Sequence, residues 1–94
     1  MRTIKWASQF KKDYKAVKKR PRHRDTLDEL LEEVLRLLMA DRTLPPRYFD
    51  HPLTGDWKDH RDCHLRPDLV LIYRKVGEDV LQLVRLGSHS DLSL

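Results

Sequence analysis

The chain has 94 residues, 39% of them apolar, so it can bury one core and is expected to form a single domain over residues 1–94. Its one cysteine, Cys63, excludes an intrachain disulfide framework and favours a reducing compartment. The longest apolar run, Leu69 to Tyr73, is too short to cross a bilayer, and the first ten residues lack the apolar segment of a signal peptide. We therefore expect a soluble, cytoplasmic protein with no membrane partner.

Charge is distributed unevenly along the chain. The net charge is +4, but residues 1–24 carry ten Lys and Arg against one acid, whereas residues 25–41 carry six acids against one Arg. The basic block is typical of a surface that binds a polyanion such as RNA, although a solvated helix face explains it equally well. Its candidate binding residues are Lys11, Lys12, Lys15, Lys18, Lys19, Arg20, Arg22 and Arg24.

The first elements are a short strand and a helix. Residues 2–6 alternate as an edge strand does, and Ser8 is placed to cap a helix that runs to about Arg20. Pro21 should end this helix, because the residue before a proline is pushed out of the α region, and residues 22–24 then form a basic turn. The apolar face of the helix recurs at spacings of three and four: Trp6, Phe10, Tyr14 and Val17.

A second helix has the most regular pattern in the chain. Thr26 and Glu29 have the spacing of a capping box, in which each side chain bonds the backbone of the other. The acids of its first two turns lie favourably at the positive end of the helix dipole. One buried stripe follows: Leu27, Leu30, Leu31, Val34, Leu35 and Leu38. The two helices should form a hairpin on one face of a sheet.

Residues 41–56 form a long connection that contains four Pro and Gly residues. Connections of this length are uncommon in compact domains and are usually functional or disordered. Tyr48, Phe49 and Leu53 give the segment something to bury, which argues against disorder. His51 lies inside it.

Three strands are predicted in the last third, over residues 57–64, 68–75 and 80–86. The second is apolar on both sides, as a central strand is, and Gly77 supplies the hairpin turn before the third. Arg85 is expected on the same face as Leu81 and Leu83. The order β-α-α-β-β-β predicts an α+β domain in which a two-helix hairpin packs on a mostly antiparallel, four-stranded sheet.

Histidine, arginine and carboxylate side chains gather near the ends of these strands. Such a set suits acid–base chemistry on an RNA phosphodiester, where a base takes the 2′-OH proton, a cation stabilises the phosphate and an acid protonates the leaving oxygen. Taken singly, each side chain also has a structural explanation, such as a loop brace, a turn carboxylate or a surface histidine. The candidates are His51, His64, Asp68, Arg85 and His89.

A metal site is a competing use of these residues. His60 and His64 are four residues apart, which places them about 13 Å apart on a strand, too far to share an ion. Cys63 points to the opposite side. We therefore expect no metal and no cofactor.

Five short motifs resemble the YafQ branch of the RelE/ParE toxin superfamily, over nearly the whole chain. They are Asp50-His51-Pro52-Leu53, Gly55-Asp56-Trp57-Lys58, residues 61–68, Leu71-Ile72-Tyr73, and Arg85-Leu86-Gly87-Ser88-His89. The resemblance implies a RelE-like fold and a ribosome-dependent mRNA endoribonuclease that a cognate antitoxin inhibits. It also implies cleavage in the ribosomal A site, leaving a 2′,3′-cyclic phosphate, and contact of the basic helix with the ribosome or with an acidic antitoxin segment.

By the same resemblance the active site consists of the five candidate residues. His64 with Asp68 would activate the 2′-OH, Arg85 would neutralise the phosphate, and His89 would protonate the leaving oxygen. His51 would orient the substrate or share the work of the base.

The chain departs from the family at its end. Where the family has a phenylalanine expected to contact the substrate base, this chain has Ser93. Two alternatives remain: a ParE-like toxin that inhibits a protein such as a topoisomerase, and a non-catalytic RNA-binding module. The first has no need of three positioned histidines, and the second rests on charge alone.

Overall fold

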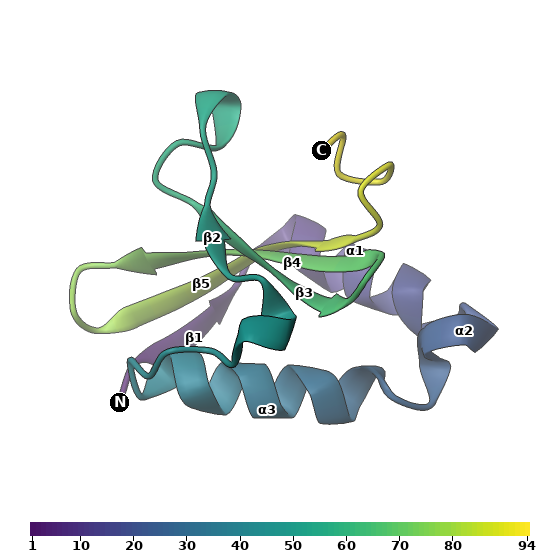
Figure 1. Cartoon of the computed structure of the whole chain (residues 1–94), viewed down its shortest axis with the longest axis horizontal. Coiled ribbons are helices and arrows are strands. Elements are labelled where there is room, and N and C mark those ends of the chain that lie inside the picture. The colour runs from purple at the N-terminus through teal and green to yellow at the C-terminus, as the bar shows by residue number, and fades with distance from the viewer.

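The computed structural model describes all 94 residues, and its elements follow the predicted order with additions (Figure 1). The helices and strands are β1 (Thr3–Trp6), α1 (Ser8–Lys18), α2 (Pro21–Arg24), α3 (Leu27–Met39), β2 (His51–Pro52), β3 (Arg61–Arg66), β4 (Leu69–Val76) and β5 (Val80–Gly87). Two short 3₁₀ helices flank β2: η1 (Pro46–Tyr48) and η2 (Gly55–Trp57).

The strands form one sheet in the order β1-β5-β4-β3-β2. β1 pairs with β5 in parallel, and the other three pairings are antiparallel. The segment that contains β2 and the C-terminal tail both stand on the side of the sheet away from α3 (Figure 1). The predicted α+β class and mostly antiparallel sheet are confirmed, but the sheet has five strands, because His51 and Pro52 pair with Asp62 and Arg61.

The main core lies between the helices and the sheet. The apolar stripe of α3 packs with α1 and with the helix-facing residues of β3, β4 and β5 in one cluster of 17 buried side chains. The most completely buried positions of the stripe are Leu27 and Val34. Periodicity thus predicted the buried face of α3 correctly. None of the helices combines the length and the apolar character that a bilayer crossing requires.

Both predicted helix caps are wrong. α1 begins at Ser8 itself, after Ala7, and no side chain caps it. Thr26 does occupy the position before α3, but its side chain makes no capping bond; Thr26 Oγ1 instead accepts a hydrogen bond of 2.8 Å from Arg66. Because Arg66 of β3, forty residues along the chain, bonds this oxygen, the capping box does not form.

The chain between the two long helices also differs from expectation. α1 ends at Lys18, and Arg20 is extended, as a residue before proline should be. The chain then forms another helical turn, α2, with Pro21 at its first position, where a fixed φ favours helix and no N–H is needed. The predicted basic turn is therefore a short helix.

The strand predicted at residues 57–64 begins later. Trp57 lies in η2, and β3 starts at Arg61 and continues to Arg66. The alternating side chains of residues 57–60 belong to a loop and not to a strand. Trp57 and Leu53 pack against a second, smaller core of Val70 and Ile72. That core is on the face of the sheet opposite the helices, and Leu92 of the tail is buried in it.

Candidate active site

The strand register gathers the candidate residues on the face of the sheet away from the helices. His51 pairs with Asp62, Asp62 with Ile72, and Ile72 with Arg85, so these four form one row across β2, β3, β4 and β5. Directly paired residues in a sheet point to the same side. His64 lies two residues after Asp62 on β3 and therefore shares this face.

Three histidine rings form a line on this face. The ring centroids of His51 and His64 are 6.3 Å apart, and those of His64 and His89 are 5.1 Å apart. Both pairs meet edge to face. Residues from β2, from β3 and from the C-terminal tail thus meet at one place, with His64 in the middle.

His89 is oriented by Asp68. The carboxylate lies 3.0 Å from His89 Nδ1 and also accepts the backbone N–H of His89 at 3.2 Å. These bonds lower the pKa of Asp68, so the carboxylate is ionised at neutral pH. With Nδ1 held by Asp68, Nε2 is left available to a substrate. The expected pairing of Asp68 with His64 is wrong: the partner of Asp68 is His89.

The tail that carries His89 is fixed at several points. Ser88 and Asp91 exchange hydrogen bonds, each from a backbone N–H to the other side chain, at 2.9 and 3.0 Å. Asp91 also forms an ion pair of 2.9 Å with Arg20 of the segment between α1 and α2. At Gly87 a Cβ would lie 2.9 Å from Asp91 Cβ, closer than real Cβ atoms come. The glycine therefore allows the tail to fold back and present His89.

Asp62 is a site residue that was not among the candidates. Its side chain is only 3% exposed, and burial raises its pKa against the opposing attraction of the three histidines. His51 Nδ1 lies 3.0 Å from Asp62 Oδ1 but bonds the carbonyl of Phe49 at 2.8 Å, so Oδ1 has no hydrogen-bond partner. The signal was present in the sequence, because an aspartate two residues before His64 on a strand must share its face.

The central histidine has an altered proton affinity. Burial lowers the pKa of His64, and the neighbouring His89 and His51 lower it further, while Asp62 opposes them. His64 is therefore neutral at neutral pH and can accept a proton. The line of rings thus contains an imidazole of lowered pKa, His64, whose ring centroid lies 5.1 Å from that of the carboxylate-bound His89.

Arg85 lies on the same face through an irregularity of β5. Ile72 pairs with Arg85 but Tyr73 pairs with Leu83, so Val84 is an extra, unpaired residue: a β-bulge. The bulge turns Arg85 to the face opposite Leu83. The prediction that Arg85 shares a face with Leu81 and Leu83 is therefore wrong.

The guanidinium of Arg85 is held by Asp13 of α1, with an Nε to Oδ2 distance of 2.7 Å. Asp13 also accepts the backbone N–H of Leu86 at 3.0 Å. Burial acts to raise the pKa of Asp13, but the hydrogen bonds from Arg85, Leu86 and Gln9 outweigh it and hold that pKa below its usual value. An ionised carboxylate therefore holds Arg85 beside the site.

The loop before β2 is anchored under His51. Asp50 accepts hydrogen bonds from the Tyr73 hydroxyl at 2.5 Å and from Arg61 Nε at 3.3 Å. Tyr73 is buried in the main core, so the loop is tied to the centre of the sheet. No group of three or more His, Cys, Asp and Glu side chains is arranged to hold a metal ion.

The family profile described as "Bacterial toxin of type II toxin-antitoxin system, YafQ" matches residues 2–94. The chain belongs to the YafQ toxin family. It is 40% identical over 91 residues to the mRNA interferase toxin YafQ of Escherichia coli K12, covering 97% of this chain and 95% of that protein.

Solved structures of YafQ-family proteins and related toxins superpose on nearly the whole fold. YafQ from E. coli BL21(DE3) shares 38% identity with a TM-score of 0.83, and 98% of each chain is covered. The E. coli DinJ-YafQ complex gives 40% identity and a TM-score of 0.81, again over 98% of each chain. A metal-bound toxin from Helicobacter pylori gives 47% identity and a TM-score of 0.85, over 98% of this chain and 99% of that one. The fold expected from the YafQ resemblance is therefore confirmed.

The end of the chain is anchored by one residue and departs from the YafQ pattern at the next. Leu92 is 3% exposed and packs in the small core, which anchors the tail. Ser93, where an aromatic ring is expected, is exposed and has a positive φ of 56°. It offers no surface on which a base can stack.

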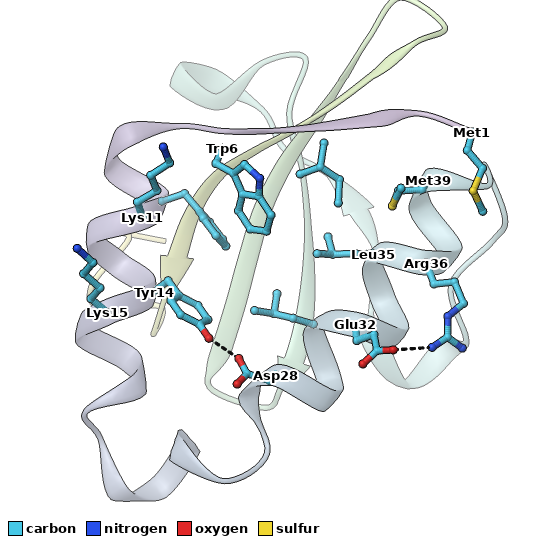
Figure 2. Close-up of a pocket in the computed structure, with 13 residues that line it drawn as sticks. Met1, Trp6, Lys11, Tyr14, Lys15, Asp28, Glu32, Leu35, Arg36 and Met39 are labelled. Atoms are coloured by element: carbon cyan, nitrogen blue, oxygen red, sulfur yellow. Dashed lines mark hydrogen bonds and ion pairs between the residues drawn. The ribbon is translucent and has the colours of Figure 1, made fainter.

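A separate groove, with no histidine in its lining, lies between α1, α3 and β1 (Figure 2). Its volume is about 810 Å³, and its walls are mostly apolar, with Trp6 and Phe10 on one side and Leu35 and Met39 on the other. Hydrogen bonds cross or border it between Tyr14 and Asp28 and between Arg36 and Glu32.

Proposed function

We propose that this chain is a ribosome-dependent mRNA endoribonuclease that cuts by attack of the 2′-OH on the adjacent phosphodiester, acting in the bacterial cytoplasm to inhibit translation. The observation that carries the proposal is the line of three histidine rings, His51, His64 and His89, on one face of the sheet. The E. coli relative, YafQ, is an mRNA interferase toxin.

His64 is the proposed general base. It takes the proton of the 2′-OH, whose oxygen then attacks phosphorus. A base must be unprotonated at working pH, and the lowered pKa of His64 meets this requirement. Asp62, on the same face of β3, stabilises the imidazolium that forms, because its negative charge acts to raise the pKa of His64 against the effect of burial.

His89 is the proposed general acid. It donates a proton to the 5′-oxygen as the P–O bond breaks, which leaves a 2′,3′-cyclic phosphate and a 5′-OH. Asp68 holds the ring by Nδ1, so the proton would leave from Nε2. The proposal thus assigns Asp68 to the acid and not to the base: His64 acts as the base, and His89 supported by Asp68 acts as the acid. Each positioned proton transfer contributes roughly 10²–10⁴-fold.

Arg85 is the proposed partner of the phosphate. Arg85 lies in the same cross-strand row as Asp62, and its guanidinium is hydrogen-bonded to the carboxylate of Asp13. Arginine has five donors, so Asp13 occupies only part of its bonding capacity. His51, at the other end of the row, is proposed to orient the substrate.

The basic residues of the first third are proposed to bind ribosomal RNA. Lys18 is paired with Asp28 at 2.6 Å and Arg20 with Asp91 at 2.9 Å, and Arg24 lies 3.9 Å from Asp25. The other five of the eight candidate residues are exposed and form no ion pair: Lys11, Lys12, Lys15, Lys19 and Arg22. Neutralising phosphates with five cations makes affinity fall steeply as salt rises.

A cognate antitoxin is the proposed inhibitor, as DinJ is found in complex with the E. coli relative. The apolar groove between α1, α3 and β1 suits an amphipathic antitoxin segment. Lys11 and Lys15 on its α1 side are unpaired, whereas Glu32 and Arg36 on its α3 side neutralise each other. The net positive rim favours a segment with acidic residues beside its apolar face.

The groove is tested with Trp6→Ser, which removes an exposed apolar wall and should weaken neutralisation by the antitoxin at least tenfold while leaving cleavage by free toxin unchanged. Val76→Ser is the matched control, because Val76 is 42% exposed but lies outside the groove. Equal neutralisation of both variants would place the antitoxin elsewhere.

The activity is tested in cells by inducing the wild type and His89→Ala and mapping mRNA 5′ ends. The proposal expects new ends, in register with codons, from the wild type and none from His89→Ala. Identical ends from both, or none from either, would overturn it.

A further inference from the structure

One exposed aromatic ring lies against the histidine line. Phe49 is 65% exposed, although a phenylalanine of this size gains most by burial. Among the other exposed large apolar side chains, Trp6 borders the groove between the helices, and Val76 lies at the β4–β5 turn. The Phe49 centroid is 5.7 Å from that of His64.

The backbone at Phe49 is in an unfavourable conformation. Its φ of 47° and ψ of 45° are left-handed, which costs roughly 1–2 kcal/mol for a residue with a side chain. Strain of this kind near a functional site points to a role for the residue that adopts it. Here the residue that adopts it is also the one that carries the exposed ring.

The neighbours of Phe49 hold it in this position. Its N–H donates to the Pro46 carbonyl at 3.0 Å, and its own carbonyl accepts from His51 Nδ1 at 2.8 Å. Tyr48 before it is buried and bonded to Glu33, and Asp50 after it is bonded to Tyr73. The ring is thus presented by a fixed loop.

A hollow of about 690 Å³ opens between Phe49 and His64. Its other walls include Leu65 and two cations, Arg47 and Arg66. Arg47 is paired with Glu33 at 2.7 Å and Arg66 donates to Thr26 Oγ1 at 2.8 Å, so each guanidinium keeps further donors for a ligand. A flat apolar ring and two cations suit a nucleotide of single-stranded RNA, with the base on the ring.

We propose that this hollow binds a nucleobase adjacent to the scissile phosphate and that Phe49 supplies the surface on which that base stacks. The inference rests on the proposed ribonuclease activity. It assigns to the loop before β2 a contact that the tail cannot make, because Ser93 has no aromatic face. Stacking on Phe49 places the ribose of that nucleotide beside His64.

The test uses purified protein and 70S ribosomes programmed with synthetic mRNA. Phe49→Leu removes the aromatic face, and Phe49→Tyr is the matched control that keeps it. Loss of one base–aromatic stack should lower kcat/KM by roughly 5–150-fold for Phe49→Leu, whereas Phe49→Tyr stays within about threefold.

A second substrate series separates stacking from a structural effect. Each A-site codon position in turn carries an abasic ribose that keeps its 2′-OH. At one codon position the missing base should lower kcat/KM of the wild type by the same factor as Phe49→Leu lowers it on intact mRNA. At that position kcat/KM of Phe49→Leu should not fall further when the base is missing. The pH profile of Phe49→Leu should match the wild type, since stacking does not change the proton affinity of His64.

Two results would overturn the inference. The first is that Phe49→Leu cleaves as fast as the wild type. The second is that, at every codon position, Phe49→Leu on abasic mRNA loses the product of two factors: the factor that the substitution costs on intact mRNA and the factor that the missing base costs the wild type. In both cases the wild type still cleaves, so the ribonuclease proposal stands. A wild type that cleaves no programmed mRNA overturns both.

Discussion

Asp13 holds α1 against β5 and holds Arg85 beside the site, so its removal should have a large effect. The side chains of Asp13 and Arg85 are 10% and 26% exposed, which leaves their ion pair weakly screened. Asp13→Ala removes the acceptor of the buried Leu86 N–H and the partner of a half-buried guanidinium. Each loss costs about 1–3 kcal/mol, so we expect about 2–6 kcal/mol in total, and each kcal/mol lowers Tm by roughly 4–8 °C.

Urea unfolding followed by circular dichroism measures this change, with Asp13→Asn and Asp25→Ala as controls. Asp13→Asn keeps an oxygen for Leu86 and should cost less. Asp25→Ala breaks only a 3.9 Å contact between exposed charges and should change stability by under about 0.5 kcal/mol. Because the folded pKa of Asp13 is lowered from 3.8, its charge stabilises the fold above that pH, and the difference from Asp13→Asn should shrink as pH falls below it. Equal stabilities of wild type and Asp13→Ala would refute this reasoning.

Three further predictions follow from the site. Gly87→Ala places a Cβ 2.9 Å from Asp91 and should displace the tail that carries His89, lowering cleavage at least about tenfold with an unchanged circular dichroism spectrum; full activity would show that the tail adapts. Asp50→Ala removes two hydrogen bonds beneath the loop of His51 and should lower both the free energy of unfolding, by about 1–3 kcal/mol, and the cleavage rate, and no change in either would argue against the anchor. Cleavage by a paired acid and base has a bell-shaped pH–rate profile, and since the pKa of His64 is lowered from 6.5, the acidic limb should have its midpoint below that value; an acidic midpoint above 6.5 would argue against His64 as the base.

The sequence predicted those parts of the fold that have a periodic pattern. The stripe of α3, the doubly buried β4 and the turn at Gly77 each depend on neighbours in the chain, and the structure agrees. β2 has only two residues, too few to show a period, and was missed. The bulge at Val84 was missed because a shift of register between strands leaves no sign in either strand alone.

The gathering of the site residues was predicted better than their pairings. The three histidines come together as expected, since each lies at a strand end or in a loop next to one. The partners of Thr26 and Asp68 were wrong, because long-range contacts with Arg66 and His89 decide them. The left-handed backbone that exposes Phe49 has no sequence signature comparable to a glycine.

The central claim is that the histidine line performs the chemistry, and the product ends test it most directly. Ribosome-bound mRNA is cleaved with the purified wild type and with His64→Ala combined with His89→Ala, and the termini are analysed. The account predicts a 5′-OH and a 2′,3′-cyclic phosphate from the wild type, and no cleavage by the double variant although it remains folded and ribosome-bound. A 5′-phosphate product, or cleavage by the double variant at the wild-type rate, would contradict it.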